Sequence, residues 1–322
     1  MFLPRLLAGV LLTIAFALPA FSQQAFPARE IHFIVPWDGG GANDLAARHL
    51  QDILAADRIL VVVENAAGAN GTIGLSKVAN ATPNGYTVGM GTSSTISAMV
   101  NKVTTLQNKQ FESIARISTD PFLLYVNTSS PNATLEKFMD NMKANPAKVS
   151  IGIAGTYTVP HMLIEMASRA AKTTYVHIPY SGSSKVIVSM LGEHIDAAIL
   201  KASDGKAMAD AGKIKPIGAF DRQRLSAYPD VPTFAEKGYD VFPFGNIVQM
   251  SYVVAPAGLP EPVKQRLIAI FSKAIQSPKF KAFAAENSFL ADDLTGKQLD
   301  TEAQAIQAAM DKVMPTFFKS DK

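Results

Sequence analysis

The sequence predicts a two-lobe α/β protein with mostly parallel sheets that are joined by crossover strands. Short apolar runs typical of buried strands alternate with stretches of helical periodicity along the chain. A strand, a loop and a helix follow one another around Gly40, and the same order returns around Thr158 in the second half. The length of 322 residues allows two domains, each with a sizeable core.

The first of these patterns begins with residues 31–35, an apolar run that predicts a buried strand ending at Pro36. Glycines 39–41 permit left-handed backbone and a close approach of a ligand. Apolar residues then recur at helical spacing from about Ala42. Because the first N–H groups of a helix have no partner within it, we expect an anion seat here.

The second pattern places a strand at residues 149–154, a loop at 155–160 and a helix from His161 onward. Two such seats, one in each half of the chain, predict two lobes that face one small anionic ligand. Lobe 1 is expected to comprise residues 23–124 and 222–322, and lobe 2 residues 125–221.

The remaining strands and helices follow from the same periodicities. The turn after the strand at 86–90 is a hydroxyl-rich loop with Thr92 and Ser93, at the end of a strand where open α/β sheets bind ligands. Residues 221–232 are expected to form a polar return to lobe 1. Further strands are expected at 59–63, 114–117, 122–126, 175–178, 195–200, 214–219 and 249–255, and three terminal helices at about 260–276, 278–287 and 296–318.

Residues 1–22 have the pattern of a secretory signal peptide. Arg5 precedes an apolar stretch over 6–18, and small residues at Ala20 and Ser22 predict cleavage after Ser22. An uncleaved anchor is the alternative, although the stretch is short for a membrane span. The chain has no cysteine, which excludes a lipoprotein signal, disulfides and thiol-ligated metals. An exported chain of this kind is expected in a bacterial periplasm.

Charge and motif content argue against several classes of function. A formal net charge of +3 without a basic cluster disfavours a nucleic-acid partner. The five histidines lack metal-ligand spacing, and the glycine loop matches no nucleotide-binding motif, so we expect no metal and no cofactor. A nucleophile elbow is also missing, which makes a catalytic role of His161 a poor hypothesis beside ligand or loop hydrogen bonding.

Side chains near the two loops allow more than one interpretation. Asp44, in a first helical turn, would stabilise the helix dipole and brace the loop, or would accept a hydrogen bond from a ligand. Trp37, Tyr157 and Tyr180 are either core residues or walls of an apolar pocket. Lys201 follows a buried strand and would meet a second ligand carboxylate there. Arg222 and Arg224 are more simply explained as solvated.

An ordered series of motifs resembles the Bug/TctC family of periplasmic solute-binding receptors of tripartite tricarboxylate transporters. The series covers nearly the whole mature chain, and it comprises residues 26–29, 35–44, 63–65, 68–71, 83–86, 178–182, 211–213, 229–233 and 254–258. The resemblance implies a type II periplasmic-binding-protein clamshell that captures a small organic acid. It also implies membrane permease subunits as partners, and we expect a monomer. A ligand sensor and a hydrolase or transferase with the same clamshell are the alternatives.

The resemblance adds candidate ligand-binding residues to those found above. Family members hold a ligand carboxylate with backbone and hydroxyl groups of loops that match residues 37–44 and 155–161. The chain departs from the family pattern at 155–160, 200–204 and 245–252, which affects the ligand more than the fold. The candidate site is Trp37, Gly40, Gly41, Ala42, Asp44, Thr92, Ser93, Thr156, Tyr157, Thr158, His161, Tyr180, Ser181, Gly182 and Lys201.

Overall fold

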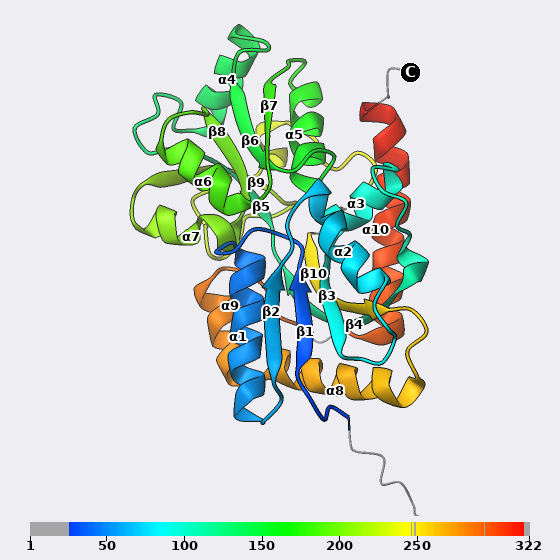
Figure 1. Ribbon diagram of the computed structural model, residues 1–322. Helices are drawn as coiled ribbons and strands as arrows, with labels where there is room; N and C mark the ends of the chain where they lie inside the picture. The colour runs from blue at the N-terminus through cyan, green and yellow to red at the C-terminus, as the bar shows by residue number, and fades with distance from the viewer. Residues whose placement is uncertain (1–25, 246, 248, 293, 319–322) are drawn as a thin grey trace, which may run out of the picture.

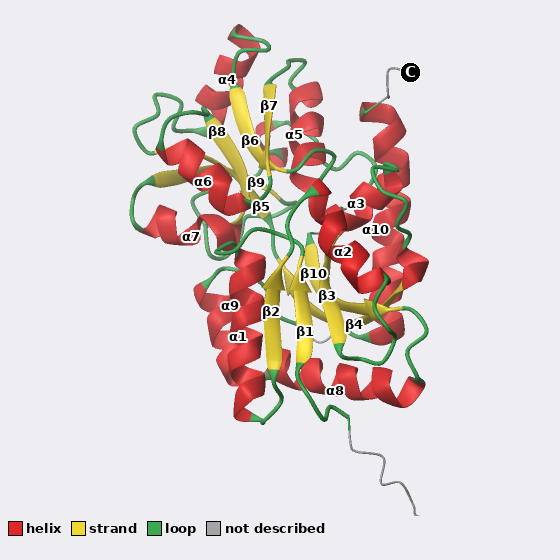
Figure 2. Ribbon diagram, in the orientation of Figure 1, coloured by secondary structure: helices red, strands yellow, loops and turns green. Residues whose placement is uncertain are grey.

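A computed structural model describes residues 26–245, 247, 249–292 and 294–318 and contains two five-stranded sheets, one in each lobe (Figure 1). Helices cover both sheets, and the two lobes are stacked one above the other in Figure 2. The signal peptide expected at 1–22 lies outside the described residues. In the part of the chain that is described, no helix combines the length and the hydropathy needed to cross a membrane.

The sheet of lobe 1 has the strand order β2-β1-β3-β10-β4. Strands β1, β2 and β3 run parallel, whereas β10 is antiparallel to both of its neighbours. The strands are β1 (Ile31–Val35), β2 (Val61–Asn65), β3 (Thr87–Thr92), β4 (Phe111–Thr119) and β10 (Met250–Pro256).

The sheet of lobe 2 has the order β7-β6-β8-β5-β9, with β5 antiparallel to β8 and β9 and the other pairs parallel. The predicted α/β class with two mostly parallel sheets is therefore confirmed, because four strands of each sheet point the same way and only β10 in lobe 1 and β5 in lobe 2 run against them. Strands β5 and β10 come from the other lobe without a helical crossover on their own sheet, which parallel neighbours require. The strands are β5 (Phe122–Asn127), β6 (Ser150–Ala154), β7 (Val176–Tyr180), β8 (Ala197–Lys201) and β9 (Ile214–Phe220).

The helices begin and end close to the positions that the periodicities predict, with one exception. Residues 93–95 form the first turn of a helix, not a loop, because Thr92 and Thr95 cap each other's backbone N–H groups at 2.9 and 3.2 Å. The α-helices are α1 (Ala42–Ala56), α2 (Thr72–Ala79), α3 (Ser93–Val100), α4 (Leu135–Ala144), α5 (Val159–Ala170), α6 (Ser183–Leu191), α7 (Ala202–Asp210), α8 (Glu261–Gln276), α9 (Pro278–Glu286) and α10 (Gly296–Phe317). Short 3-10 turns lie at Ala69–Gly71, Asn108–Gln110 and Ala235–Lys237.

The chain passes between the sheets at Asp120 and Pro121, which separate β4 from β5. This position is slightly earlier than the expected boundary after residue 124. The return to lobe 1 is later than expected, because Phe234 stacks on Phe220 of β9 at 4.2 Å between ring centroids and Lys237 pairs with Glu136 of α4. Residues 231–242 thus cover lobe 2, and β10 makes the return.

Helix α10 belongs to lobe 1 but reaches lobe 2 at its end. It packs along β4 and α3, and Figure 1 shows it extending past the level of the junction between the lobes. Phe318, just after its last turn, contacts the ring of Tyr157 with centroids 5.2 Å apart.

Candidate functional site

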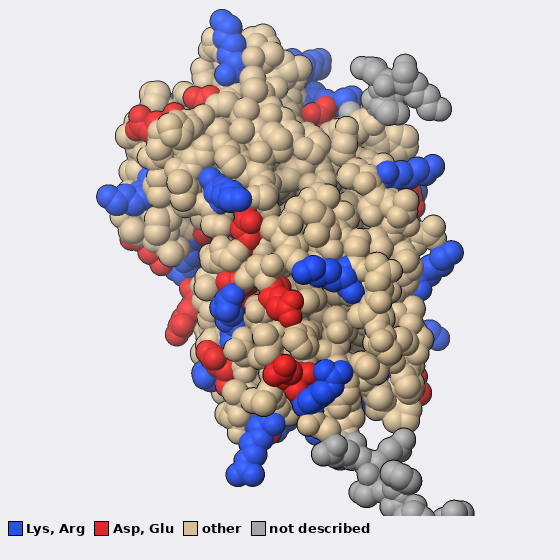
Figure 3. Space-filling model, in the orientation of Figure 1, with Lys and Arg blue, Asp and Glu red and all other residues tan. Residues whose placement is uncertain are grey.

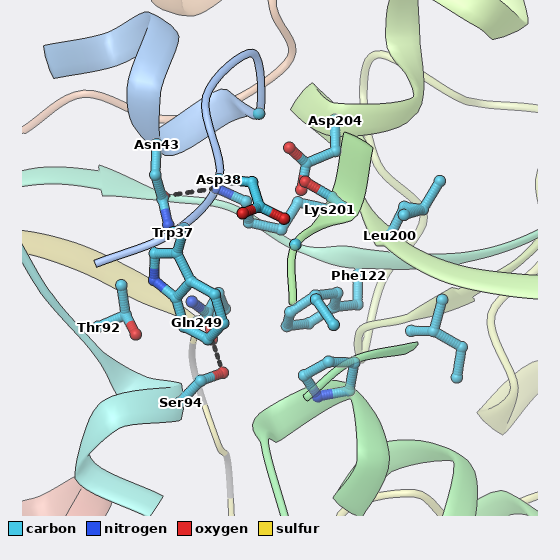
Figure 4. Close-up of a pocket in the computed structure, with 16 residues that line it drawn as sticks. Trp37, Asp38, Asn43, Thr92, Ser94, Phe122, Leu200, Lys201, Asp204 and Gln249 are labelled. Carbon is cyan, nitrogen blue, oxygen red and sulfur yellow. Dashed lines mark hydrogen bonds between the residues drawn. The ribbon is translucent and has the colours of Figure 1, made fainter. Parts of the chain in front are cut away.

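A cavity lies between the two lobes, with residues of both on its walls (Figure 4). Its volume is about 50 Å³, room for only a few water molecules at roughly 10–15 Å³ each. Lobe 1 contributes Trp37, Asp38, Gly41, Asn43, Thr92, Ser94 and Gln249, and lobe 2 contributes Phe122, Ala154, Pro160, Gly182, Ser183, Ile199, Leu200, Lys201 and Asp204.

Both lobes contribute polar side chains to the cavity, and lobe 2 adds the apolar Phe122, Ile199 and Leu200. Thr92, Ser94 and Gln249 gather on one side of the Trp37 ring in Figure 4, and Ser94 Oγ lies 3.4 Å from Gln249 Oε1. Trp37 is only 9% exposed, and its Nε1–H has no hydrogen-bond partner among the described residues. Buried N–H groups usually have a protein or water partner, so this one is an exception in the structure.

The glycine-rich loop after β1 is held in place by the buried carboxylate of Asp44. This carboxylate accepts hydrogen bonds from the Gly40 N–H at 2.9 Å, from Arg48 Nε at 3.0 Å and from Asn65 Nδ2 at 3.0 Å. Burial alone would raise the pKa of Asp44, but these donors outweigh it and lower the pKa. Asp44 therefore braces the loop, as one of the two hypotheses states, and it does not line the cavity.

Asp38, at the tip of the same loop, joins the lobes. Its carboxylate accepts a hydrogen bond from Ser181 Oγ at 2.6 Å and lies 3.0 Å from Lys185 Nζ. Burial raises the pKa of Asp38, but the hydrogen bonds to Ser181 and Lys185 and the charge of Lys185 lower it by more, so the net pKa is below its usual range. Ser184 Oγ donates to the Gly39 carbonyl at 3.3 Å from the same face of lobe 2.

The anion seat at the start of α1 is filled by a carboxylate of the protein itself. Gly41 is the N-cap of α1 and supplies no side chain, so the first N–H groups of the helix need outside partners. The Ala42 N–H donates to Asp204 Oδ1 at 2.7 Å, and Asp204 belongs to the first turn of α7 in lobe 2. This contact crosses the cavity between the lobes.

Lys201 enters the cavity from the end of β8 and is 6% exposed. Its Nζ donates to Asn43 Oδ1 at 2.9 Å, which Figure 4 marks, and lies 3.6 Å from Asp120 Oδ2. Asp120 is completely buried and also accepts hydrogen bonds from the backbone N–H and the hydroxyl of Ser203. Burial raises the pKa of Asp120 to about 6, although Lys201 and Ser203 oppose this rise.

The second loop, between β6 and α5, contacts lobe 1 mainly through its backbone. The Tyr157 carbonyl accepts a hydrogen bond from Ser97 Oγ, and the Thr156 N–H donates to Asn70 Oδ1 at 3.1 Å. The Tyr157 N–H donates to Nδ1 of His161 at 2.9 Å.

His161 is buried in lobe 2 against a second histidine. Its ring stacks on His177 with centroids 3.9 Å apart. Burial and the neighbouring His177 lower the pKa of His161 to about 3, so the ring is neutral near pH 7. His161 therefore holds its own loop through a hydrogen bond.

The structure brings five of the predicted site residues to the cavity: Trp37, Gly41, Thr92, Gly182 and Lys201. Ala42 lies beside it through its N–H, and Ser181 contacts Asp38 behind it. The Tyr180 hydroxyl pairs with Ser189 Oγ at 2.5 Å, away from the cavity. The hydroxyls of Thr158 and Ser93 are engaged locally, with the Ala154 carbonyl and the Met250 N–H. The others outside the cavity lining are Gly40, Asp44, Thr156, Tyr157 and His161.

Several cavity residues were missed by sequence reasoning. Asp38 and Asn43 lie within the predicted first loop, and Ser94 and Ser183 directly follow predicted site residues. Their position next to predicted residues could have identified them as cavity residues. Pro160 lies within the predicted second loop. Asp204 and Leu200 lie in one segment that departs from the family pattern, and Gln249 lies in another. Phe122 gave no signal that separates it from an ordinary strand residue.

Charges elsewhere on the molecule do not point to another kind of site. No group of three or more His, Asp or Glu side chains is arranged to hold a metal ion within the described ranges. On the face in Figure 3, basic and acidic side chains are interspersed, and neither sign forms a continuous field there.

Two α/β lobes around a shared cavity are the architecture expected of a clamshell solute-binding protein, and comparisons with known proteins support this class. Residues 45–315 match the sequence model of the tripartite tricarboxylate transporter family receptor, TctC. A UPF0065 protein of Bordetella pertussis is 31% identical over 282 residues, covering 85% of this chain and 86% of that protein. Protein BugT of the same species is 30% identical over 295 residues, covering 88% and 89%.

Solved structures share the fold. MatC of Rhodopseudomonas palustris, with bound malate, gives a TM-score of 0.82 at 24% identity, covering 89% of this chain and 99% of that one. Rpa4515 of R. palustris, with adipate, gives 0.84 at 22% identity, covering 90% and 98%.

The chain belongs to the tripartite tricarboxylate transporter receptor family. It is a solute-binding receptor of a family that works with membrane components of a transporter.

Proposed function

We propose that the protein binds a small organic acid between its lobes and delivers it to the permease subunits of a tripartite transporter. The cavity between the lobes carries this proposal: side chains that can donate hydrogen bonds, Thr92, Ser94 and Lys201, line it together with an apolar surface of Phe122, Ile199 and Leu200. Pockets of this composition suit a ligand with a carboxylate and a carbon chain. Related proteins of the same fold are described with malate and with adipate.

The proposal further holds that the receptor acts as a monomer and carries out no reaction. The second part is supported by His161: Nδ1 accepts the Tyr157 N–H, so the neutral ring carries its proton on Nε2 and has no free lone pair to act as a base. A general base needs a free nitrogen and a nucleophile within hydrogen-bond reach. A sensor role would use the same binding step with a signalling partner in place of a permease.

A thermal-shift screen of organic acids, starting with malate and adipate, tests the proposal. A specific acid at 100 times its dissociation constant stabilises the folded state by about 2.7 kcal/mol. Trp37→Phe keeps the aromatic wall but removes the Nε1–H, so calorimetry should show about tenfold weaker binding of that acid with little change in melting temperature. If no acid stabilises the protein, the proposed binding is wrong. If Trp37→Phe binds as tightly as the wild type, the Nε1–H is not a ligand contact.

A further inference from the structure

We propose that Asp204 is a tethered competitor for the ligand, whose carboxylate occupies the anion seat of α1 and holds the lobes together until an external acid displaces it. The contact between the Ala42 N–H and Asp204 Oδ1 is short, 2.7 Å, and it joins residues of opposite lobes. It resembles the interaction that a ligand carboxylate would make with the same N–H. The competition part of this inference rests on the proposed binding of an organic acid.

The surroundings of Asp204 support this role. Gly41 brings the backbone of lobe 1 so close that a Cβ there would lie 3.0 Å from Ser183 Oγ and 3.7 Å from Asp204 Oδ1. Among the described residues, the basic side chain that lines the cavity, Lys201, is directed to Asn43 and Asp120 and not to Asp204. The hydrogen bond that the structure gives Asp204 therefore comes from the helix start, where a partial positive charge favours an anion.

The size of the cavity indicates that a ligand displaces Asp204 from the helix start and does not simply fill existing space. About 50 Å³ holds only a few waters, which is too little for a dicarboxylate the size of malate or adipate. A ligand of this class must part the lobes to enter, and parting them separates Ala42 from Asp204. The N–H freed by this movement then faces the cavity that Trp37 lines.

Two variants test the two partners of this contact one at a time. Asp204→Asn removes the charge, so a ligand carboxylate no longer competes with another carboxylate. Ala42→Pro removes the N–H itself at the first position of α1, where proline is well tolerated. The extended backbone of Gly41, with φ −83° and ψ 166°, suits a residue before proline. Asp210→Asn is the matched control, because Asp210 lies at the exposed end of the same helix and pairs with Lys206.

The first measurement needs no ligand. The chain has one tryptophan, and it lies in the cavity, so its emission reports whether the lobes are closed. Asp204→Asn and Ala42→Pro should both give a red-shifted Trp37 emission and a larger radius of gyration in X-ray scattering, whereas Asp210→Asn matches the wild type. Wild-type values for both test variants would overturn the tethered contact, whatever the protein binds.

The second measurement uses calorimetry with malate and adipate as probes. Asp204→Asn should bind the acid about tenfold tighter, because the ligand then displaces a weaker, uncharged competitor. Ala42→Pro should bind about as tightly as the wild type, because it removes both the contact that the ligand must break and the one that it gains. Weaker binding by Asp204→Asn would show that Asp204 contacts the ligand directly, and unchanged binding would place the ligand elsewhere; both results refute competition. If no variant binds either probe, the choice of organic acid is wrong, and the tryptophan and scattering results alone decide the contact.

Discussion

The buried pair formed by Lys201 and Asp120 makes a quantitative prediction for Lys201→Met. Their charged atoms lie 3.6 Å apart, which corresponds to an attraction of roughly 5 kcal/mol at an effective dielectric constant of about 20. Removing Lys201 leaves a buried carboxylate without its counter-ion, a change that destabilises proteins by about 3–5 kcal/mol. Asp120 has a cheaper alternative, however, because it can take up a proton.

This alternative makes the loss depend on pH. With Lys201 present, Asp120 titrates at about 6, raised by burial. At pH 5 it is already protonated, so losing Lys201 changes its energy little. Above pH 6 the variant must protonate Asp120 at a cost of about 1.4 kcal/mol per pH unit. The extra loss in the free energy of unfolding is then about 1 kcal/mol at pH 7 and about 3 kcal/mol at pH 8.5, on top of a constant loss of about 1 kcal/mol for the hydrogen bond to Asn43.

Urea unfolding of the wild type and Lys201→Met at pH 5, 7 and 8.5 measures this slope. Lys206→Met is the control, because Lys206 pairs with exposed Asp210 and its removal should change stability by less than about 0.5 kcal/mol at every pH. In an Asp120→Asn background, Lys201→Met should lose its pH dependence altogether. A loss that is equal at all three pH values, or a slope that persists with Asp120→Asn, would refute the reasoning.

Two other variants test the second loop. Gly155→Ala should lose about 2–3 kcal/mol of stability in urea, because Gly155 has φ +86° and a Cβ would lie 2.5 Å from Asn70 Oδ1, whereas Gly212→Ala, with φ +66° and open space, should lose only about 1 kcal/mol; equal losses would mean that the loop does not press on lobe 1. His161 has its pKa lowered to about 3, so it stabilises the fold fully above pH 6.5 and loses this contribution as the pH falls toward 3. His161→Asn, which keeps an acceptor for the Tyr157 N–H, should therefore show a smaller fall in melting temperature between pH 6.5 and pH 4.5 than the wild type, and an identical fall would contradict the assignment.

The strands and helices could be predicted closely because local periodicity determines them. The last helix, expected at 296–318, spans Gly296–Phe317, and the first strand has the expected bounds. The seat at Ala42 was also predictable, since free N–H groups follow from any helix start. Its occupant was not, because Asp204 reaches it only when the lobes close, and no local pattern records that distance.

Side-chain direction was the second limit. Tyr180 ends β7 and Ser181 directly follows it, and successive side chains along an extended backbone point to opposite faces. Ser181 contacts Asp38 across the lobes, whereas Tyr180 packs into lobe 2 beside Ser189. The sequence indicates that one of the two faces the other lobe, but which one depends on how the strand sits in its sheet.

The position of β10 has a consequence for the order in which the chain assembles. Lobe 2 draws its whole sheet from one continuous stretch, β5 to β9, whereas in lobe 1 the late strand β10 lies between β3 and β4. Until residues 250–256 arrive, β3 and β4 therefore each present an unsatisfied backbone edge, the kind of edge that pairs wrongly with other chains. Newly made protein is thus most vulnerable to aggregation in lobe 1, and this vulnerability ends when β10 pairs with β3 and β4.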